Sequence, residues 1–177
     1  MQRFLRLLLT YLVIIGSFCA FSNVVLGATL PTKLQAALFK KIFLYDKVLH
    51  GKEGDSLKVL VATTSDFNQD PDELVTAFKA VGISAQKMGV NEIANNIASA
   101  AAVYIHGHIA PDSIKALCAN RSVLSISGYS ELAESGSVSI ALGIAKGRPE
   151  IIVNMKRLKI DGHEISSDLL ALARVIK

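Results

Sequence analysis

Residues 123–177 read VLSISGYSELAESGSVSIALGIAKGRPEIIVNMKRLKIDGHEISSDLLALARVIK, and this last third of the chain decides the fold. Short apolar segments at 123–127 and 137–142 predict two strands, the second with one exposed face because polar and apolar residues alternate. Residues 143–147 predict a turn and 149–153 a returning strand. The stretch therefore predicts an antiparallel hairpin at one edge of a sheet.

Two helical patterns follow the hairpin. Asn154 is placed to cap a short helix over residues 155–158. A last helix is expected to start after Ser166 and to run almost to the C-terminus. Its predicted inward side chains recur at spacings of three and four residues, namely Ile165, Leu169, Leu172 and Ile176.

Upstream of residue 123, strand patterns alternate with helix patterns. Residues 57–63 and 101–106 predict buried strands, and residues 83–88 predict another strand between them. One helix is predicted by Asp70 as N-cap, Pro71 at the first helical position, Glu73 reaching back to the cap and Gly82 at the end. Asn91 is expected to cap the next helix, and Pro111 to begin a third. This order predicts an α/β fold: a single three-layer domain with a mostly parallel sheet, helices on both faces and an antiparallel hairpin near the C-terminus.

The first helix is expected over residues 30–49. A stripe at helical spacing predicts which side chains face the sheet, and Phe39, Phe43 and Leu44 widen it. The members of the stripe are Leu34, Leu38, Ile42, Tyr45 and Leu49.

Residues 1–27 have the order of a secretory signal peptide. Arg3 and Arg6 precede an apolar segment at 7–15, and small residues follow at cleavage sites after Ser22 or Gly27. We therefore expect a cleaved leader at 1–27, a domain at 28–177 and a periplasmic location. An uncleaved anchor over residues 7–26 is the alternative.

Charge and cysteine content restrict the function further. The chain has 19 Lys and Arg against 15 Asp and Glu, and removal of Arg3 and Arg6 leaves 17 against 15, a net charge of +2. This balance argues against a nucleic-acid partner. Cys118 is the one cysteine after the leader, so the processed chain has no internal disulfide, and its helical position predicts burial.

Two histidines are the most chemical-looking feature. His106 and His108 come where a predicted strand ends. If the strand continues, side chains at i and i+2 point the same way, so the two histidines are weak candidates for a pair of metal ligands. Asp66 or Asp112 could add a carboxylate to that site. A polar loop with surface histidines is the favoured interpretation, and no cofactor is expected. No nucleophile motif or phosphate loop is present, which favours a protein that is not an enzyme.

Taken over its length, the chain resembles the YfiR family of periplasmic proteins, also called YfiR/HmsC-like. The resemblance rests on the order and spacing of five segments: LQAALF at 34–39, AVYI at 102–105, VLSIS at 123–127, IIVN at 151–154 and ISSDLLALARVI at 165–176. It implies a regulator that binds the periplasmic part of an inner-membrane signalling protein, a diguanylate cyclase or a sensor kinase, and restrains cyclic-di-GMP synthesis and biofilm formation. It also implies a possible homodimer. The sequence departs from the family in two places. Relatives have a cysteine before the AVYI strand and a Trp-Pro turn after the first helix, and this sequence has neither.

A protein that works by contact needs an apolar patch with a polar rim. Candidates for that patch are Ile144 in the hairpin and Ile165, Leu169 and Leu172 near the last helix, although packing against the sheet is the expected use of such side chains. The alternative function is a periplasmic small-ligand-binding protein that feeds a transporter or a sensor kinase. Its pocket would use the predicted strand ends at residues 64–66, 106–107 and 127–129.

Overall fold

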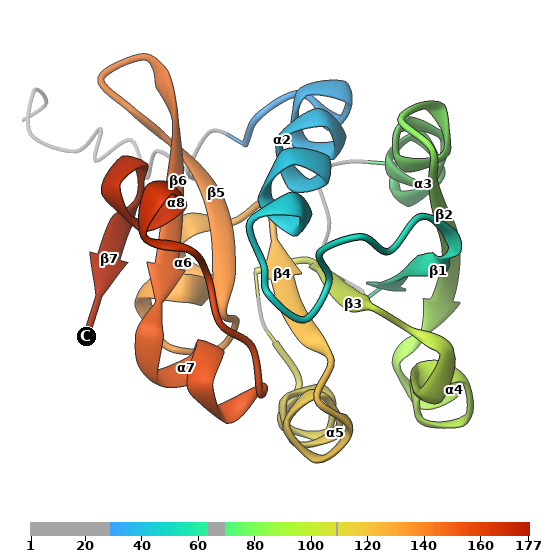
Figure 1. The fold of residues 1–177 in the computed structure, drawn as a ribbon. Coiled ribbons are helices and arrows are strands. Elements are labelled where there is room, and N and C mark those ends of the chain that lie inside the picture. The colour runs from blue at the N-terminus through green and yellow to red at the C-terminus, as the bar shows by residue number, and fades with distance from the viewer. Residues whose placement is uncertain (1–28, 64–69, 109) are drawn as a thin grey trace, which may run out of the picture.

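A computed structural model describes residues 29–63, 70–108 and 110–177, and its centre is a seven-stranded sheet (Figure 1). The strand order is β2-β1-β3-β4-β5-β6-β7, and neighbours pair in parallel except β5 and β6, which are antiparallel. The strands are β1 Gly54–Thr63, β2 Ile83–Gly89, β3 Ala102–His106, β4 Leu124–Ser127, β5 Ile140–Ala145, β6 Arg148–Asn154 and β7 Arg174–Ile176.

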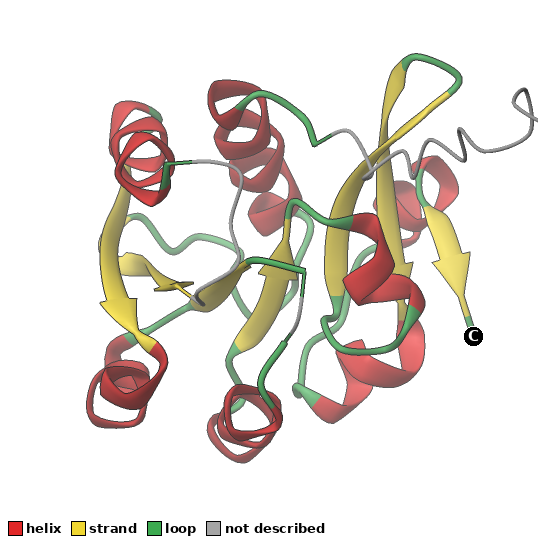
Figure 2. Ribbon diagram, turned by 180° about the vertical axis from the view of Figure 1, so that it is seen from behind, coloured by secondary structure: helices red, strands yellow, loops and turns green. Residues whose placement is uncertain are grey.

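Helices cover both faces of the sheet, as Figures 1 and 2 show from opposite sides. One apolar core joins the sheet to α2, α3, α7 and α8, and a second joins it to α4, η1, α5 and α6. Successive residues of β1 alternate between the two cores, which is why the strand reads as a continuous apolar run. The helices are α2 Thr32–Leu44, α3 Pro71–Ala80, α4 Val90–Asn96, η1 Ile97–Ser99, α5 Asp112–Arg121, α6 Ser130–Glu134, α7 Met155–Ile160 and α8 Ser167–Leu172.

These observations confirm the predicted α/β class, the mostly parallel sheet and the antiparallel hairpin. Several local signals are confirmed too. Asp70 caps α3 by accepting a hydrogen bond from the Asp72 N–H at 2.9 Å, and Asn154 caps α7 by accepting one from the Arg157 N–H at 2.9 Å. Cys118 is fully buried, and this burial raises the pKa of its thiol to about 12. None of the helices in the described part of the chain has the length and apolar composition to cross a membrane.

The predicted inward face of the first helix is wrong in part: Ile42, Phe39, Phe43 and Leu49 are buried as predicted, but Leu34, Leu44 and Tyr45 are not. The helix ends at Leu44, and Leu34 and Tyr45 are 38% and 40% exposed, whereas Phe39 and the polar Gln35 are fully buried. Gln35 is satisfied inside because its amide N–H donates to the Leu30 carbonyl at 2.6 Å and its amide oxygen accepts from the Tyr104 hydroxyl at 2.6 Å. Because apolar residues lie on both sides of this helix, periodicity alone did not decide between them.

The predicted C-terminal helix is wrong beyond Leu172. Ala173 has φ −101° and ψ 152°, which leaves the helical region, and Arg174–Ile176 pair with β6 as a parallel strand. The hairpin is therefore not at the edge of the sheet, because β7 lies outside it. Arg174 links β7 to its neighbours through ion pairs with Glu134 and Glu150. The hydrogen bond that its guanidinium donates to the Glu134 carboxylate raises the pKa of the guanidinium.

Smaller corrections concern turns and caps. The hairpin turn is the two-residue loop Lys146–Gly147, with φ values of 51° and 74°, while Gly143 lies inside β5. Glu73 accepts from the Thr32 hydroxyl at 2.7 Å and not from the N-cap of its own helix. The helix predicted to start at Asn91 has Gly89 as its N-cap. The segment predicted as half-exposed, 137–142, is buried from Val138 onward.

A buried polar cluster ties the C-terminal part to the parallel strands. The Asp161 carboxylate follows α7 and is fully buried, and it accepts hydrogen bonds from the hydroxyls of Ser125 on β4 and Ser139 before β5, the latter at 2.6 Å. Its other oxygen accepts from the Arg157 guanidinium at 2.6 Å. Arg157 also donates to the Lys115 carbonyl of α5 at 2.5 Å. One carboxylate thus joins two strands and, through Arg157, two helices.

Asp161→Ala is expected to lower the free energy of unfolding by about 3–5 kcal/mol, because it leaves the Arg157 charge buried without its partner. Urea unfolding followed by circular dichroism measures the change. Asp168→Ala, which removes an exposed carboxylate from the first turn of α8, is the control and is expected to cost no more than about 0.5 kcal/mol. Equal losses in the two variants would contradict a structural role for the cluster.

Candidate functional site

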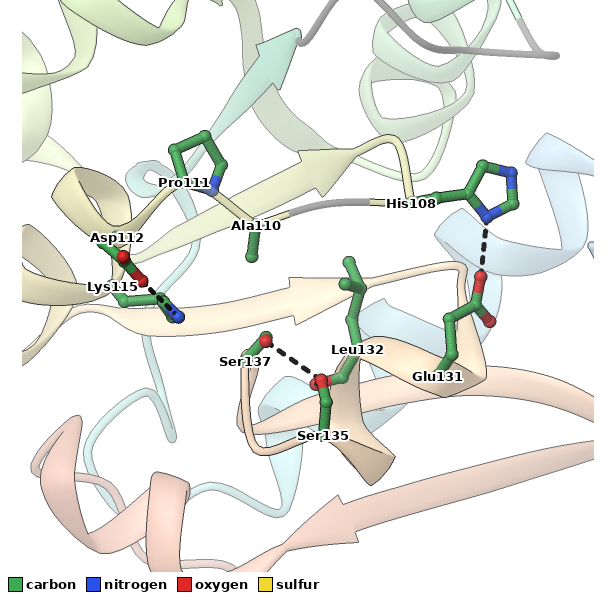
Figure 3. A pocket seen from close by; sticks show the side chains of 9 residues that line it. All are labelled: His108, Ala110, Pro111, Asp112, Lys115, Glu131, Leu132, Ser135 and Ser137. Atoms are coloured by element: carbon green, nitrogen blue, oxygen red, sulfur yellow. Dashed lines mark hydrogen bonds and ion pairs between the residues drawn. The ribbon is translucent and has the colours of Figure 1, made fainter.

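Beyond the ends of β3 and β4 lies a hollow of about 580 Å³, drawn in Figure 3. We call it the His108 hollow. Its base is apolar, and its rim carries a pair of polar side chains at each end. His108 pairs with Glu131 at one end, and Lys115 pairs with Asp112 at the other. The lining residues are His108, Ala110, Pro111, Asp112, Lys115, Glu131, Leu132, Ser135 and Ser137.

The two histidines of the sequence motif separate at the end of β3. The strand ends at His106, and Gly107 has φ +139°, a conformation that favours glycine, so the continuing strand on which the metal-pair hypothesis depended is not present. His106 is fully buried, and this burial lowers the pKa of its imidazole. The negative charge of Asp70 acts in the opposite direction. His108 turns toward the rim, where its Nδ1 lies 2.7 Å from Glu131 Oε1.

Tyr129 lies against both imidazoles. The ring centroids of His106 and Tyr129 are 6.5 Å apart and those of His108 and Tyr129 are 4.4 Å apart. Within the described residues, no group of three or more His, Cys, Asp or Glu side chains is placed to hold a metal ion. Asp112 pairs with Lys115 at 2.5 Å, which lowers the pKa of its carboxyl, and Asp66 lies outside the described residues.

The other predicted pocket residues have structural roles. Ser127 is fully buried, donates its hydroxyl to the Ile105 carbonyl at 2.9 Å and accepts from the Tyr129 N–H at 3.2 Å. A Cβ at Gly128 would lie 2.5 Å from the Tyr104 hydroxyl, so this turn is already filled by side chains. Residues 64–66 lie outside the described residues. The open space lies further out, at His108 and Glu131, and the sequence did not indicate it because Glu131, Ser135 and Ser137 match no motif.

The four residues predicted to contact a partner are divided by burial. Ile165 and Leu169 are 4% and 3% exposed and pack in the core. Ile144 at the hairpin and Leu172 at the end of α8 are 42% and 76% exposed. Partner contact stays a prediction for all four, but only Ile144 and Leu172 offer apolar surface in the structure.

Leu172 stands next to the outermost strand of the sheet. In the described chain, β7 pairs with β6 on one side and with no strand on the other. Ile176 on β7 and the 49% exposed Ile160 on α7 line a second hollow, of about 300 Å³, beside this strand. We call Ile160, Leu172 and the strand Arg174–Ile176 the β7 edge. It combines unpaired backbone with apolar side chains, which is what an added partner segment requires.

Comparison with known proteins now decides the family. A model of the YfiR/HmsC-like family matches residues 32–174, which span all the described elements from α2 to the start of β7. The chain belongs to the YfiR/HmsC-like family. This membership confirms the resemblance seen in the sequence. A search of curated proteins found no match.

Two solved structures are similar in fold to this YfiR/HmsC-like chain. One is an ABC domain from Streptococcus pneumoniae in complex with L-Trp, with a TM-score of 0.57 and 13% identity over 83% of this chain. The other is a conserved domain protein from Vibrio cholerae O1 biovar El Tor, with a TM-score of 0.53 and 12% identity over 83% of this chain. The chain spans 62% and 60% of their lengths. At these identities the likeness concerns the fold alone.

If His106 and His108 held a zinc ion, replacing both would weaken the binding of Zn²⁺, and we expect no such weakening. A structural zinc site needs four ligands, and among the described residues Glu131 is the one potential ligand that His108 contacts. The His106→Ala/His108→Ala variant should therefore bind Zn²⁺ as weakly as the unaltered protein. Isothermal titration calorimetry on both proteins measures this. Tighter binding by the unaltered protein, lost in the variant, would establish a metal site and overturn our interpretation of the two histidines.

Proposed function

We propose that this protein is a non-enzymatic periplasmic regulator that binds the periplasmic part of an inner-membrane signalling protein, a diguanylate cyclase, and restrains cyclic-di-GMP synthesis. The family match over residues 32–174 is the observation that carries the proposal. Residues 1–27 direct export and are removed, and residues 28–177 form the regulatory domain.

The geometry of the described residues supports action by contact. The hydroxyls of Ser125 and Ser139 are buried donors to Asp161, and the Cys118 thiol is buried with a raised pKa, so these potential nucleophiles are held in the protonated state away from solvent. By contrast, the β7 edge presents apolar side chains and strand backbone to the outside. A partner strand added there would gain main-chain hydrogen bonds and would cover Leu172 and Ile160.

Deletion of the gene is expected to raise cellular cyclic-di-GMP and surface attachment. A chromosomal Leu172→Glu substitution should reproduce much of this rise, because a charge buried at the centre of an interface weakens binding by roughly tenfold or more. Mass-spectrometric measurement of cyclic-di-GMP in whole cells checks both.

Ala80→Glu is the matched control, since it adds the same charge at an exposed position at the end of α3, which packs against β2 at the opposite end of the sheet. Ala80→Glu should leave cyclic-di-GMP unchanged. Immunoblotting confirms that each variant accumulates to the same level. An unchanged cyclic-di-GMP level in the deletion strain would rule out the cyclase as the target.

A small-ligand-binding function, feeding a transporter or a sensor kinase, is the second candidate, and the His108 hollow favours it. The hollow has an acidic and a basic group on its rim, as a binding site for a zwitterion requires, and the similar ABC domain is described in complex with L-Trp. Lys115 would meet a ligand carboxylate and Glu131 a ligand ammonium group.

This second function makes a separate prediction. L-Trp should raise the thermal unfolding midpoint of the unaltered protein, and Glu131→Gln should reduce that rise because it removes the carboxylate that would hold the ammonium group. Glu53→Gln, at an exposed loop position, should respond like the unaltered protein. A rise of equal size in all three proteins, or no rise in any, counts against ligand binding at the His108 hollow.

A further inference from the structure

The outer face of α2 concentrates exposed apolar side chains. Leu44 is 54% exposed, and the other members of the group are 38–42% exposed. Among the described residues, seven large apolar side chains are exposed, and four of these lie within residues 34–48, namely Leu34, Leu44, Tyr45 and Val48. Leu34, Leu44 and Tyr45 were predicted from the sequence to face inward, and Tyr45 and Val48 lie in the turn that follows α2. The fold and the proposed contact surface leave all four uncovered.

The same face carries only positive charge. Lys33, Lys40 and Lys41 are exposed, and the sequence of α2 contains no acidic residue. Lys40 donates to the Val81 carbonyl at 2.6 Å, while Lys33 and Lys41 form no ion pair with any described residue.

Two acidic side chains nearby are already engaged. Glu73 accepts from the Thr32 hydroxyl at 2.7 Å, and Glu164 pairs with Lys47. α2 itself therefore carries a surplus of positive charge, because its sequence has three lysines and no acidic residue.

The position of Lys41 shows what kind of partner this face suits. With 3.6 residues per turn, Lys41 lies between Leu44 on one side and Leu34 and Tyr45 on the other. The cores of protein–protein interfaces are depleted in lysine, because a central ammonium group must lose its water. At a membrane surface the lysine stem can lie along the apolar region while the ammonium group reaches the phosphates.

A second copy of the chain is a poor occupant. In a two-fold dimer each copy offers the same patch, so the lysines of one copy would lie against a patch whose charged side chains are also lysines. Like charges in such contacts are unfavourable. Anionic lipid headgroups supply the complementary charge without a shaped surface, which matches a convex helix.

We propose that the outer face of α2 binds the surface of a membrane that contains anionic phospholipid, with Lys33 and Lys41 at the phosphates and Leu34, Leu44 and Tyr45 at the level of the headgroups. In the sequence, α2 is the first helix after the predicted leader. The proposal does not rest on the proposed function, since a purified protein can show it without any signalling partner.

The test uses the protein as the cell processes it, with its N-terminus determined by mass spectrometry, and sedimentation with vesicles. Vesicles of phosphatidylethanolamine and phosphatidylglycerol should bind it, and phosphatidylcholine vesicles should not. Binding should fall steeply toward about 1 M salt, where the Debye length is about 3 Å. Lys33→Glu/Lys41→Glu should weaken binding by about fivefold or more for each lysine.

Matched variants on α7 separate this site from general charge and hydrophobicity. Lys156→Glu/Lys159→Glu changes the net charge by the same amount as Lys33→Glu/Lys41→Glu. Leu44→Ser tests the apolar part of the α2 face, and Ile160→Ser is its counterpart on α7 because the two side chains are 54% and 49% exposed. The α7 variants should bind like the unaltered protein and the α2 variants should not.

Failure of the unaltered protein to bind anionic vesicles overturns the proposal. So does equal weakening by the α2 and α7 variants, or binding that a retained leader produces equally in every variant. Recruitment of the purified protein to vesicles only when an acidic membrane protein is present would assign the face to a protein partner and would also overturn it.

Discussion

The Asp161 carboxylate is the group on which the rest of the structure depends. It is fully buried, and it accepts hydrogen bonds from Ser125, Ser139 and Arg157 at a point where β4, β5 and α7 meet. A buried ion pair contributes little net stability compared with apolar packing, but removal of one partner is costly. Its effect is therefore to fix one arrangement of the elements around it. Residues 154–162 can lie against the parallel strands in few other ways without leaving a buried charge unsatisfied.

A second buried contact extends this arrangement to the beginning of the domain. His163 Nδ1 lies 2.8 Å from Asp46 Oδ2, and its Nε2 lies 3.2 Å from the Ser122 carbonyl oxygen. The loop after α7 is thereby joined to the end of α2 and to the end of α5. The outer face of α2 and the β7 edge are consequently held in a fixed relation on the domain. In the two proposals made above, one surface faces a membrane while the other contacts a protein in it.

The fold could be predicted from the sequence where a single local signal had no competitor. Asp70 and Pro71 defined the start of α3, and the apolar run of β1 required cover on both faces. Prediction failed where two patterns overlapped. The spacing of Leu169, Leu172 and Ile176 suits a helix, but the exposed edge of β6 offers a strand partner that only the folded sheet reveals. Gln35 was not part of the predicted apolar stripe, and its burial depends on Tyr104, 69 residues away in the sequence.

The candidate sites were predictable only in part. The strand end at His106 was found, but the position of its hollow depends on Glu131 and Lys115, which come from two different helices and share no motif. Leu172 was named as a contact residue for the wrong reason, since it was expected to lie on the apolar face of a helix that continued almost to the C-terminus. Part of the apolar outer face of α2 was visible in the sequence, but Leu34, Leu44 and Tyr45 were assigned to the buried side because apolar residues surround most of this helix.

Site-specific photocrosslinking in living cells tests the central claim, contact with an inner-membrane signalling protein through the β7 edge, most directly. A photoreactive residue at position 172 is compared with one at position 80, and the crosslinked species are identified by mass spectrometry. The account predicts that position 172 yields an inner-membrane protein with a diguanylate cyclase output domain and that position 80 does not. Crosslinks to that protein from both positions alike, or from neither, would contradict it.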